Sequence, residues 1–192
     1  MLEPCMVLPI VRYPEPVLRA KCRPVTEVTP QIRELAANML ETMREANGVG
    51  LAAPQVAVDV HLAVIDVSHN PQCISFLKVN GEDVADMTKH MPVVFMNAKL
   101  ELGSAKETGE EGCLSFPGLR GDIRRSAEIK VTFMNLDGQT VTMETDGLLA
   151  RAFQHEIDHL NGVLFIDRMS AAAKVGLKRK LSRLMAEWED ED

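Results

Sequence analysis

The feature that most constrains this chain is the stretch at 153–162, FQHEIDHLNG, in which His155 and His159 stand four residues apart and Glu156 follows the first. In an α-helix, residues four apart lie one turn apart, so both imidazoles would face the same side. The surrounding sequence is apolar over most of its helical surface. Such a helix is typical of a domain centre, and we expect the rest of the chain to pack around it.

The remaining sequence predicts two further helices and several strands. Thr29 and Pro30 favour a helix start, and Asp146 is expected to cap the central helix. Strands are predicted at 61–67 and 93–102, a hairpin at 128–145 and a last helix at 170–188. Strands before a late core helix, without βαβ alternation, indicate an α+β fold. We expect one domain over 1–192, with antiparallel or mixed sheets around the central metal-binding helix and a C-terminal helix.

Composition and charge narrow the class of protein. Of the 192 residues, 46% are hydrophobic and 26% charged, which indicates a folded globular domain. The net charge of −7 argues against binding of DNA by the whole surface. The N-terminal sequence lacks the pattern of a secretion signal, and no stretch reaches membrane-spanning length. We therefore expect a cytoplasmic protein with its four cysteines reduced.

The histidine pair predicts a metal site but does not complete it. A catalytic zinc-type site takes three protein ligands and keeps one position for water. The alternative is a helix whose two histidines are satisfied by ordinary hydrogen bonds. Predicted burial and the adjacent carboxylate of Glu156 favour the metal site.

Three routes lead to a third ligand. A histidine after Gly162 would complete one known pattern, but Phe165 occupies the required position. Glu187 is the candidate glutamate on a later helix, although its segment resembles a surface tail. Cys113 lies in a loop between strands, and thiolate is a strong ligand for zinc and iron. Taken alone, Cys113 is more often a buried thiol than a ligand.

Three short segments together resemble the peptide deformylase family: GVGLAAPQ at 48–55, EGCLS at 111–115 and QHEIDH at 154–159. They occur in the family's order with comparable separations, and a weaker resemblance extends from Tyr13 to about Asp167. The resemblance implies removal of the N-formyl group from the starting methionine of new polypeptides, with release of formate. Their N-formylmethionyl nascent peptides would be the substrates.

The resemblance also implies a role for each motif residue. Cys113, His155 and His159 would hold one divalent metal, with Fe(II) as the physiological ion and zinc, nickel or cobalt as substitutes. Glu156 would take a proton from water and deliver it to the leaving amine. The side-chain amide of Gln55 and the backbone N–H of Leu114 would donate hydrogen bonds to the formyl oxygen.

The substrate methionine requires an apolar pocket beside the metal. Leu148 and Ala152 precede His155 on its own helix face and are wall candidates together with Val49. Gly50 would let the backbone approach the substrate closely. The alternative is that the apolar residues among them simply belong to the core.

Two segments depart from a minimal member of the family. Residues 68–92 form a longer connection than expected, which predicts an extra hairpin, a lid or a contact surface. The last helix carries a run of basic residues, and it is either an ordinary solvated helix or a contact with ribosomal RNA. The basic residues are Lys174, Lys178, Arg179, Lys180 and Arg183.

Two rival functions share the same histidine motif. One is a metallopeptidase that cleaves internal peptide bonds and uses Glu187 as its third ligand. The other is a metal-binding protein whose site no longer turns over. The second would fit a chain that lacks the base or the oxyanion donor, whereas Glu156 and Gln55 are both present.

Overall fold

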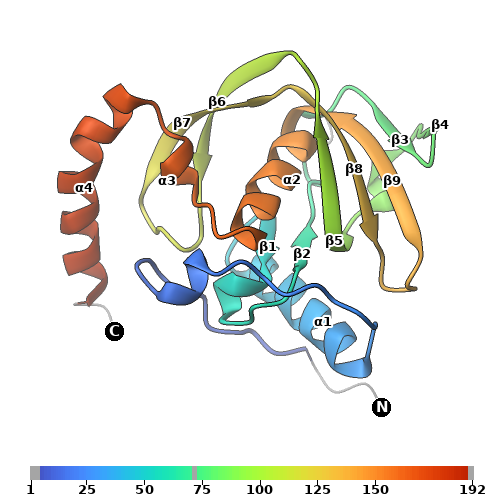
Figure 1. Cartoon of the computed structure of the whole chain (residues 1–192), viewed down its shortest axis with the longest axis horizontal. Helices are drawn as coiled ribbons and strands as arrows, with labels where there is room; N and C mark the ends of the chain where they lie inside the picture. The colour runs from blue at the N-terminus through green and yellow to red at the C-terminus, as the bar shows by residue number, and fades with distance from the viewer. Residues whose placement is uncertain (1–4, 71–72, 190–192) are drawn as a thin grey trace.

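The structure is a computed structural model that describes residues 5–70 and 73–189, and helix α2 (Gly147–Leu160) lies at its centre (Figure 1). A large antiparallel sheet covers one side of α2, and a separate two-stranded hairpin lies against another. The central position predicted for the histidine helix is therefore confirmed.

The large sheet has seven strands in the order β1-β2-β5-β8-β9-β3-β4, and each neighbouring pair is antiparallel. Their bounds are β1 Gly50–Ala52, β2 Leu62–Ile65, β3 Leu77–Val79, β4 Glu82–Asp83, β5 Val93–Leu102, β8 Glu128–Met134 and β9 Thr140–Asp146. The predicted strands at 61–67 and 93–102 correspond to β2 and β5. The predicted hairpin is β8–β9, with Gly138 in its turn at φ +75°. The α+β class is confirmed.

Helix α2 and two further helices follow from local signals in the sequence. Helix α1 (Pro30–Glu45) begins where predicted, with the Thr29 side chain accepting a hydrogen bond from Ile32 N. Helix α4 (Ala171–Glu189) is the predicted C-terminal helix and lies at the margin of the molecule (Figure 1). A short helix α3 (Phe165–Arg168) connects α2 to α4. Single-turn helices also occur: η1 Pro16–Arg19, η2 Ala53–Val56 and η4 Met87–His90.

The sequence did not predict the second sheet, which consists of β6 (Lys106–Gly112) and β7 (Arg120–Ser126). Its strands are largely charged, so they lack the apolar alternation that marks a strand in sequence. The loop between them carries Cys113. This hairpin therefore brings the candidate thiol ligand to the helix that carries the histidines.

Apolar packing divides into three clusters around these elements. The first joins α2 to the large sheet and includes Phe95, Phe133 and Phe153. The second joins α4 to the β6–β7 loop and α3, and the third lies under α1. Because α2 contributes Phe153 and Leu160 to the first cluster, its backbone is fixed by core packing.

The role expected of Asp146 was only half right. Asp146 occupies the position before α2, but its side chain makes no hydrogen bond to that helix. Its carboxylate instead accepts hydrogen bonds from Ser75 N at 2.8 Å, from the Ser75 hydroxyl and from Phe76 N at 3.4 Å. Ser75 and Phe76 of the long connection thus occupy the carboxylate in place of the backbone N–H groups of α2.

The long connection at 68–92 contains the hairpin β3–β4, which extends the sheet beyond β9. Its turn uses Asn80 and Gly81, both at positive φ, and the Asn80 side chain accepts a hydrogen bond from Thr142 N.

Within the described residues, no helix is both long and apolar enough to cross a membrane.

Candidate metal centre

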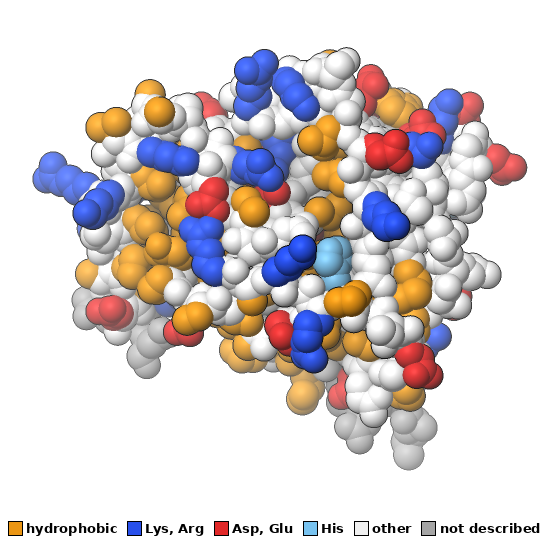
Figure 2. Space-filling view, in the orientation of Figure 1, with side chains coloured by type: hydrophobic (Ala, Val, Ile, Leu, Met, Phe, Trp, Pro, Cys, Tyr) orange, Lys and Arg blue, Asp and Glu red, His pale blue; other side chains and the backbone are white. Residues whose placement is uncertain are grey.

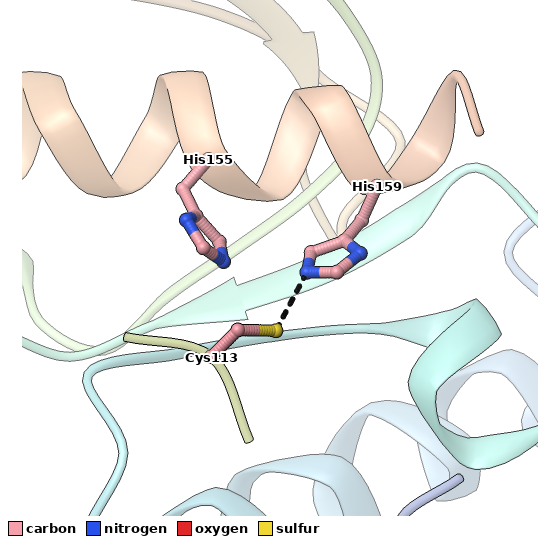
Figure 3. A group of neighbouring side chains, drawn as sticks. All are labelled: Cys113, His155 and His159. Carbon is pink, nitrogen blue, oxygen red and sulfur yellow. Dashed lines mark hydrogen bonds between the residues drawn. The ribbon is translucent and has the colours of Figure 1, made fainter. Parts of the chain in front are cut away.

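Three side chains that the sequence singled out converge at one point. His155 and His159 extend from the same side of α2, and Cys113 reaches them from the loop after β6 (Figure 3). Their ligand atoms all lie within 4.8 Å of one another, and Cys113 Sγ lies 3.2 Å from His159 Nε2. One thiolate and two imidazoles at this spacing fit a four-coordinate metal with an open position.

His155 is held by a carboxylate behind it. Its Nδ1 lies 3.0 Å from Glu111 Oε2, which leaves Nε2 as its second ring nitrogen for a ligand role. Burial opposes a charge on His155, but contacts with Cys113 and Glu111 outweigh it and raise the pKa of the imidazole. Burial lowers the pKa of His159, whose Nδ1 has no hydrogen-bond partner among the described residues.

Glu111, which contacts the predicted ligand His155, was not singled out by the sequence analysis. Its side chain is 5% exposed and accepts two hydrogen bonds from Arg125, at 2.8 and 2.9 Å, and one from Arg151 at 2.8 Å. Burial opposes ionisation, but Arg125 and His155 outweigh it and hold the pKa of Glu111 well below its ordinary value. Glu111 stands two residues before Cys113, so its place in the motif was a usable signal.

Glu156 has the burial expected of a proton carrier. It is 4% exposed, and its Oε2 has no hydrogen-bond partner within the described part of the chain. Burial raises the pKa of Glu156 to about 7. A carboxyl group with such a pKa can both accept and release a proton near neutral pH.

Gly50 makes room for this carboxyl group. A Cβ atom at position 50 would lie 2.3 Å from Glu156 Oε1, which is too close for any side chain. The glycine in the GVGLAAPQ motif therefore leaves the space in which the Glu156 carboxyl group lies.

Gln55 points its amide toward the thiol. Its Oε1 accepts a hydrogen bond from Ala52 N at 2.9 Å, and its Nε2 lies 3.5 Å from Cys113 Sγ and 3.2 Å from Ser115 Oγ. The bond from Ala52 fixes which end of the amide faces the site. An N–H donor is thus aimed at the space beside Cys113.

A cavity of about 970 Å³ opens in front of these groups. All four residues predicted to bind substrate line it, together with the predicted ligands Cys113 and His155 and the predicted catalytic residues. The four are Val49, Gly50, Leu148 and Ala152, and the catalytic residues are Gln55, Leu114 and Glu156. Among the lining residues that the sequence did not predict are Val7, Leu8 and Ile10 of the N-terminal segment.

The other candidate for the third ligand lies elsewhere. Glu187 is on α4, and its Oε1 lies 3.4 Å from Arg183 Nε. Among the described residues, the cluster of potential metal ligands comprises Cys113, His155 and His159 without Glu187.

Comparisons with known proteins agree on one family. Residues 7–175 match the family model described as Polypeptide deformylase. A peptide deformylase from Methylacidiphilum infernorum is 44% identical over 179 residues, which cover 93% of each chain. The crystal structure of peptide deformylase from Thermotoga maritima is 40% identical, with a TM-score of 0.71 over 84% of this chain and 96% of that one. A Met-Ala-Ser-bound structure of a class I type b peptide deformylase from Acinetobacter baumannii is 35% identical, with a TM-score of 0.74 over 86% and 100%.

Proposed function

Because this chain belongs to the peptide deformylase family, hydrolases that remove the N-formyl group from nascent peptides, we propose that Cys113, His155 and His159 hold its catalytic metal. The observation that carries this proposal is the approach of their three ligand atoms to within 4.8 Å of one another beside the cavity. A divalent ion held there would supply a water of lowered pKa and would polarise the formyl carbonyl. We further propose Fe(II) as the physiological ion, although the donor set also suits zinc, nickel and cobalt.

Glu156 is the proposed acid–base residue. With its pKa raised to about 7 by burial, it takes the proton from the attacking water and returns it to the amine that leaves. Its Oε2, which has no hydrogen-bond partner among the described residues, and its place in the cavity lining support this role.

Gln55 and Leu114 are the proposed donors to the formyl oxygen. Attack by water places negative charge on this oxygen, and donors that are already oriented stabilise it without further reorganisation. The amide of Gln55 is oriented by Ala52, and Leu114 adjoins Cys113 in the chain. Loss of one such donor typically lowers kcat about 100-fold to 1,000-fold.

The methionine side chain is proposed to enter the cavity against Val49, Gly50, Leu148 and Ala152. Leu148 and Ala152 come from the same helix as the histidines, so the pocket wall and two of the proposed ligands share one rigid element. A pocket wall and ligands on one rigid element would hold the formyl group at a fixed distance from the reacting groups.

The exposed side of α4 is the proposed contact with the ribosome. The proposed localisation of the protein is the cytoplasm. Leu181, Leu184 and Trp188 of α4 are buried. Its basic residues are exposed, and Figure 2 shows Lys and Arg side chains beside hydrophobic ones at the margin where α4 lies. Reversal of the charge at Lys178, Arg179 and Arg183 should weaken co-sedimentation with ribosomes, and added salt should weaken it for the unaltered protein.

The activity is tested by formate release from a formyl-methionyl tripeptide, with protein purified without oxygen and supplied with iron or nickel. The unaltered protein should release formate, and Glu156→Ala should keep its metal and lose activity. Glu34→Gln, at an exposed position on α1, is the matched control and should retain activity.

The rival functions predict other results. Cleavage of internal peptide bonds without formate would indicate a metallopeptidase, and a metal-loaded but inert protein would indicate a metal binder. Among the described residues, Glu187 lies outside the cluster of potential metal ligands and beside Arg183, which does not support the peptidase.

A further inference from the structure

Arg151 connects the helix that carries the histidines to the hairpin that carries the thiol. It lies on α2, one turn before His155, and its side chain is 11% exposed beside the cavity. Its Nη1 donates to Glu111 Oε1 at 2.8 Å and to the backbone oxygen of Ile123 at 3.0 Å. Its Nη2 donates to Glu107 Oε1 at 3.3 Å. One guanidinium thus contacts both strands of the β6–β7 hairpin.

The contact with Glu111 leads directly to a proposed metal ligand. Glu111 uses Oε1 for Arg151 and for Arg125 Nε, and Oε2 for Arg125 Nη2 and His155 Nδ1. Arg125 lies on β7, in the same hairpin as Glu111. Arg151 therefore differs from Arg125, because it holds this carboxylate from the histidine helix itself.

Gly109 provides the space in which the guanidinium lies. A Cβ atom at this position of β6 would lie 3.1 Å from both Cζ and Nη2 of Arg151. Such contacts are tighter than normal packing, so any side chain at position 109 would press on the guanidinium. The two positions form one structural unit.

We propose that Arg151, seated over Gly109, is a positioning residue that holds Glu111 against His155 and sets the spacing between the imidazole and thiolate ligands. The inference rests on the proposed metal site. Two of the ligands come from α2 and one from the loop after β6, so their spacing depends on how these elements are joined. Partners that orient a ligand typically change metal affinity 10-fold to 100-fold when removed.

The test uses Arg151→Met, Arg151→Lys and Gly109→Ala, with Glu107→Gln as the control. Methionine keeps an unbranched stem beside the cavity but has no donor, and lysine keeps the charge but has no planar fork. Gly109→Ala leaves Arg151 in place and displaces its guanidinium. Glu107 is 44% exposed and contacts the same guanidinium, whereas the carboxylate beside His155 Nδ1 is that of Glu111.

Two quantities are measured on the full chain: the dissociation constant for zinc, by competition with a chelator, and the absorption spectrum of the cobalt-loaded protein. Arg151→Met should bind zinc about 10-fold more weakly and show altered thiolate-to-cobalt bands. Gly109→Ala and Arg151→Lys should change the zinc affinity and the cobalt spectrum in the same direction, but by a smaller factor. Glu107→Gln should stay within about twofold of the unaltered protein.

The outcomes separate the inference from its premise. If the unaltered protein binds zinc and Arg151→Met binds it equally well with the same cobalt spectrum, Arg151 has no positioning role. A lower unfolding temperature with unchanged affinity and spectrum would also overturn the inference, because it would show support of the fold alone. If Arg151→Met does not fold, the other two test variants decide. Unchanged zinc affinity in both Arg151→Lys and Gly109→Ala would overturn the inference. Failure of the unaltered protein to bind zinc or cobalt would instead remove the proposed metal site.

Discussion

At the scale of single residues, Gly50 leaves the space in which the buried carboxyl group of Glu156 lies. Glu156 Oε2 lacks a partner among the described residues, and Gly50 leaves its other oxygen uncrowded. A buried carboxyl group without a partner holds its proton more tightly, which is why its pKa rises to about 7. The glycine and the acid therefore act as a pair.

Gly50→Ala should displace Glu156 and lower kcat for deformylation at least about 100-fold, the range typical of lost acid–base catalysis. The added Cβ would lie 2.3 Å from Oε1, and the carboxyl group must move. Assays of formate release measure kcat, and metal analysis measures the metal content, which should stay near one ion per chain. Gly176→Ala on α4, where the new Cβ would meet open space among the described residues, is the control and should retain full activity.

Glu111→Gln should lower the free energy of unfolding at pH 7 by roughly 1.5–3 kcal/mol, because it removes one of the two carboxylates that pair with the buried Arg125 and leaves only Asp158. The folded pKa of Glu111 lies below its ordinary 4.5, so its stabilisation is present above that pH and is lost as the pH falls through the folded pKa. The deficit of the variant should therefore shrink below about pH 4.5.

Urea unfolding at pH 7 and pH 4 measures this difference. Glu110→Gln, the adjacent and exposed glutamate that pairs with Arg120, should cost less than about 1 kcal/mol at either pH. An equal deficit for Glu111→Gln at both values would contradict the assignment of a paired, ionised carboxylate.

At the scale of elements, what could be predicted depended on whether the signal was local. The α1 start at Thr29, strands β2 and β5 and the turn at Gly138 follow from capping, alternation and turn chemistry within a few residues. The proposed ligands were found because His155 and His159 share a helix face and Cys113 lies in a recognisable motif. Their convergence to within 4.8 Å agrees with that expectation.

The missed features all depend on contacts between segments and not on a pattern within one segment. Strands β6 and β7 look like surface sequence because they are rich in charges, yet Glu111 and Arg125 are buried against each other. Asp146 was predicted to cap α2, but its carboxylate accepts a hydrogen bond from Ser75 N instead. No periodicity within one segment records such a partner.

The N-terminal segment is an element-scale prediction of its own. The Leu8 N–H donates to Thr42 Oγ1 at 2.8 Å, and this hydroxyl donates to Asn38 O at 2.7 Å inside α1. Thr42→Val keeps the shape but leaves the Leu8 N–H unpaired, which should lower the free energy of unfolding by about 1–3 kcal/mol. Because Leu8 lines the cavity, KM for a formyl tripeptide should rise as well.

Urea denaturation and steady-state kinetics check this prediction. Thr26→Val, at an exposed position, is the matched control and should change neither quantity appreciably. Lower stability with an unchanged KM would mean that the segment supports the fold without contacting substrate.

At the scale of the whole molecule, the proposed metal joins parts that the chain connects only at a distance. Cys113 stands 42 positions before His155, in the loop of a hairpin that belongs to a different sheet from the one that covers α2. Ion pairs and hydrogen bonds from Arg151, Arg125 and Gln154 already hold the hairpin to α2. An ion held by ligands from both would add a further link between them.

Removal of the metal with a chelator should therefore lower the unfolding temperature of the whole protein. An ion present at 1,000 times its dissociation constant stabilises the folded state by about 4 kcal/mol. In a chain of this size, each kcal/mol corresponds to roughly 2–4 °C, so a fall of roughly 8–16 °C is expected, and restored metal should reverse it. Calorimetry with and without metal measures the difference. Cys113→Ser, which removes the thiolate, should lose most of the shift, whereas Cys5→Ser, at an exposed thiol, should keep it. The same shift in both variants would show that the ion stabilises the protein from a site without Cys113.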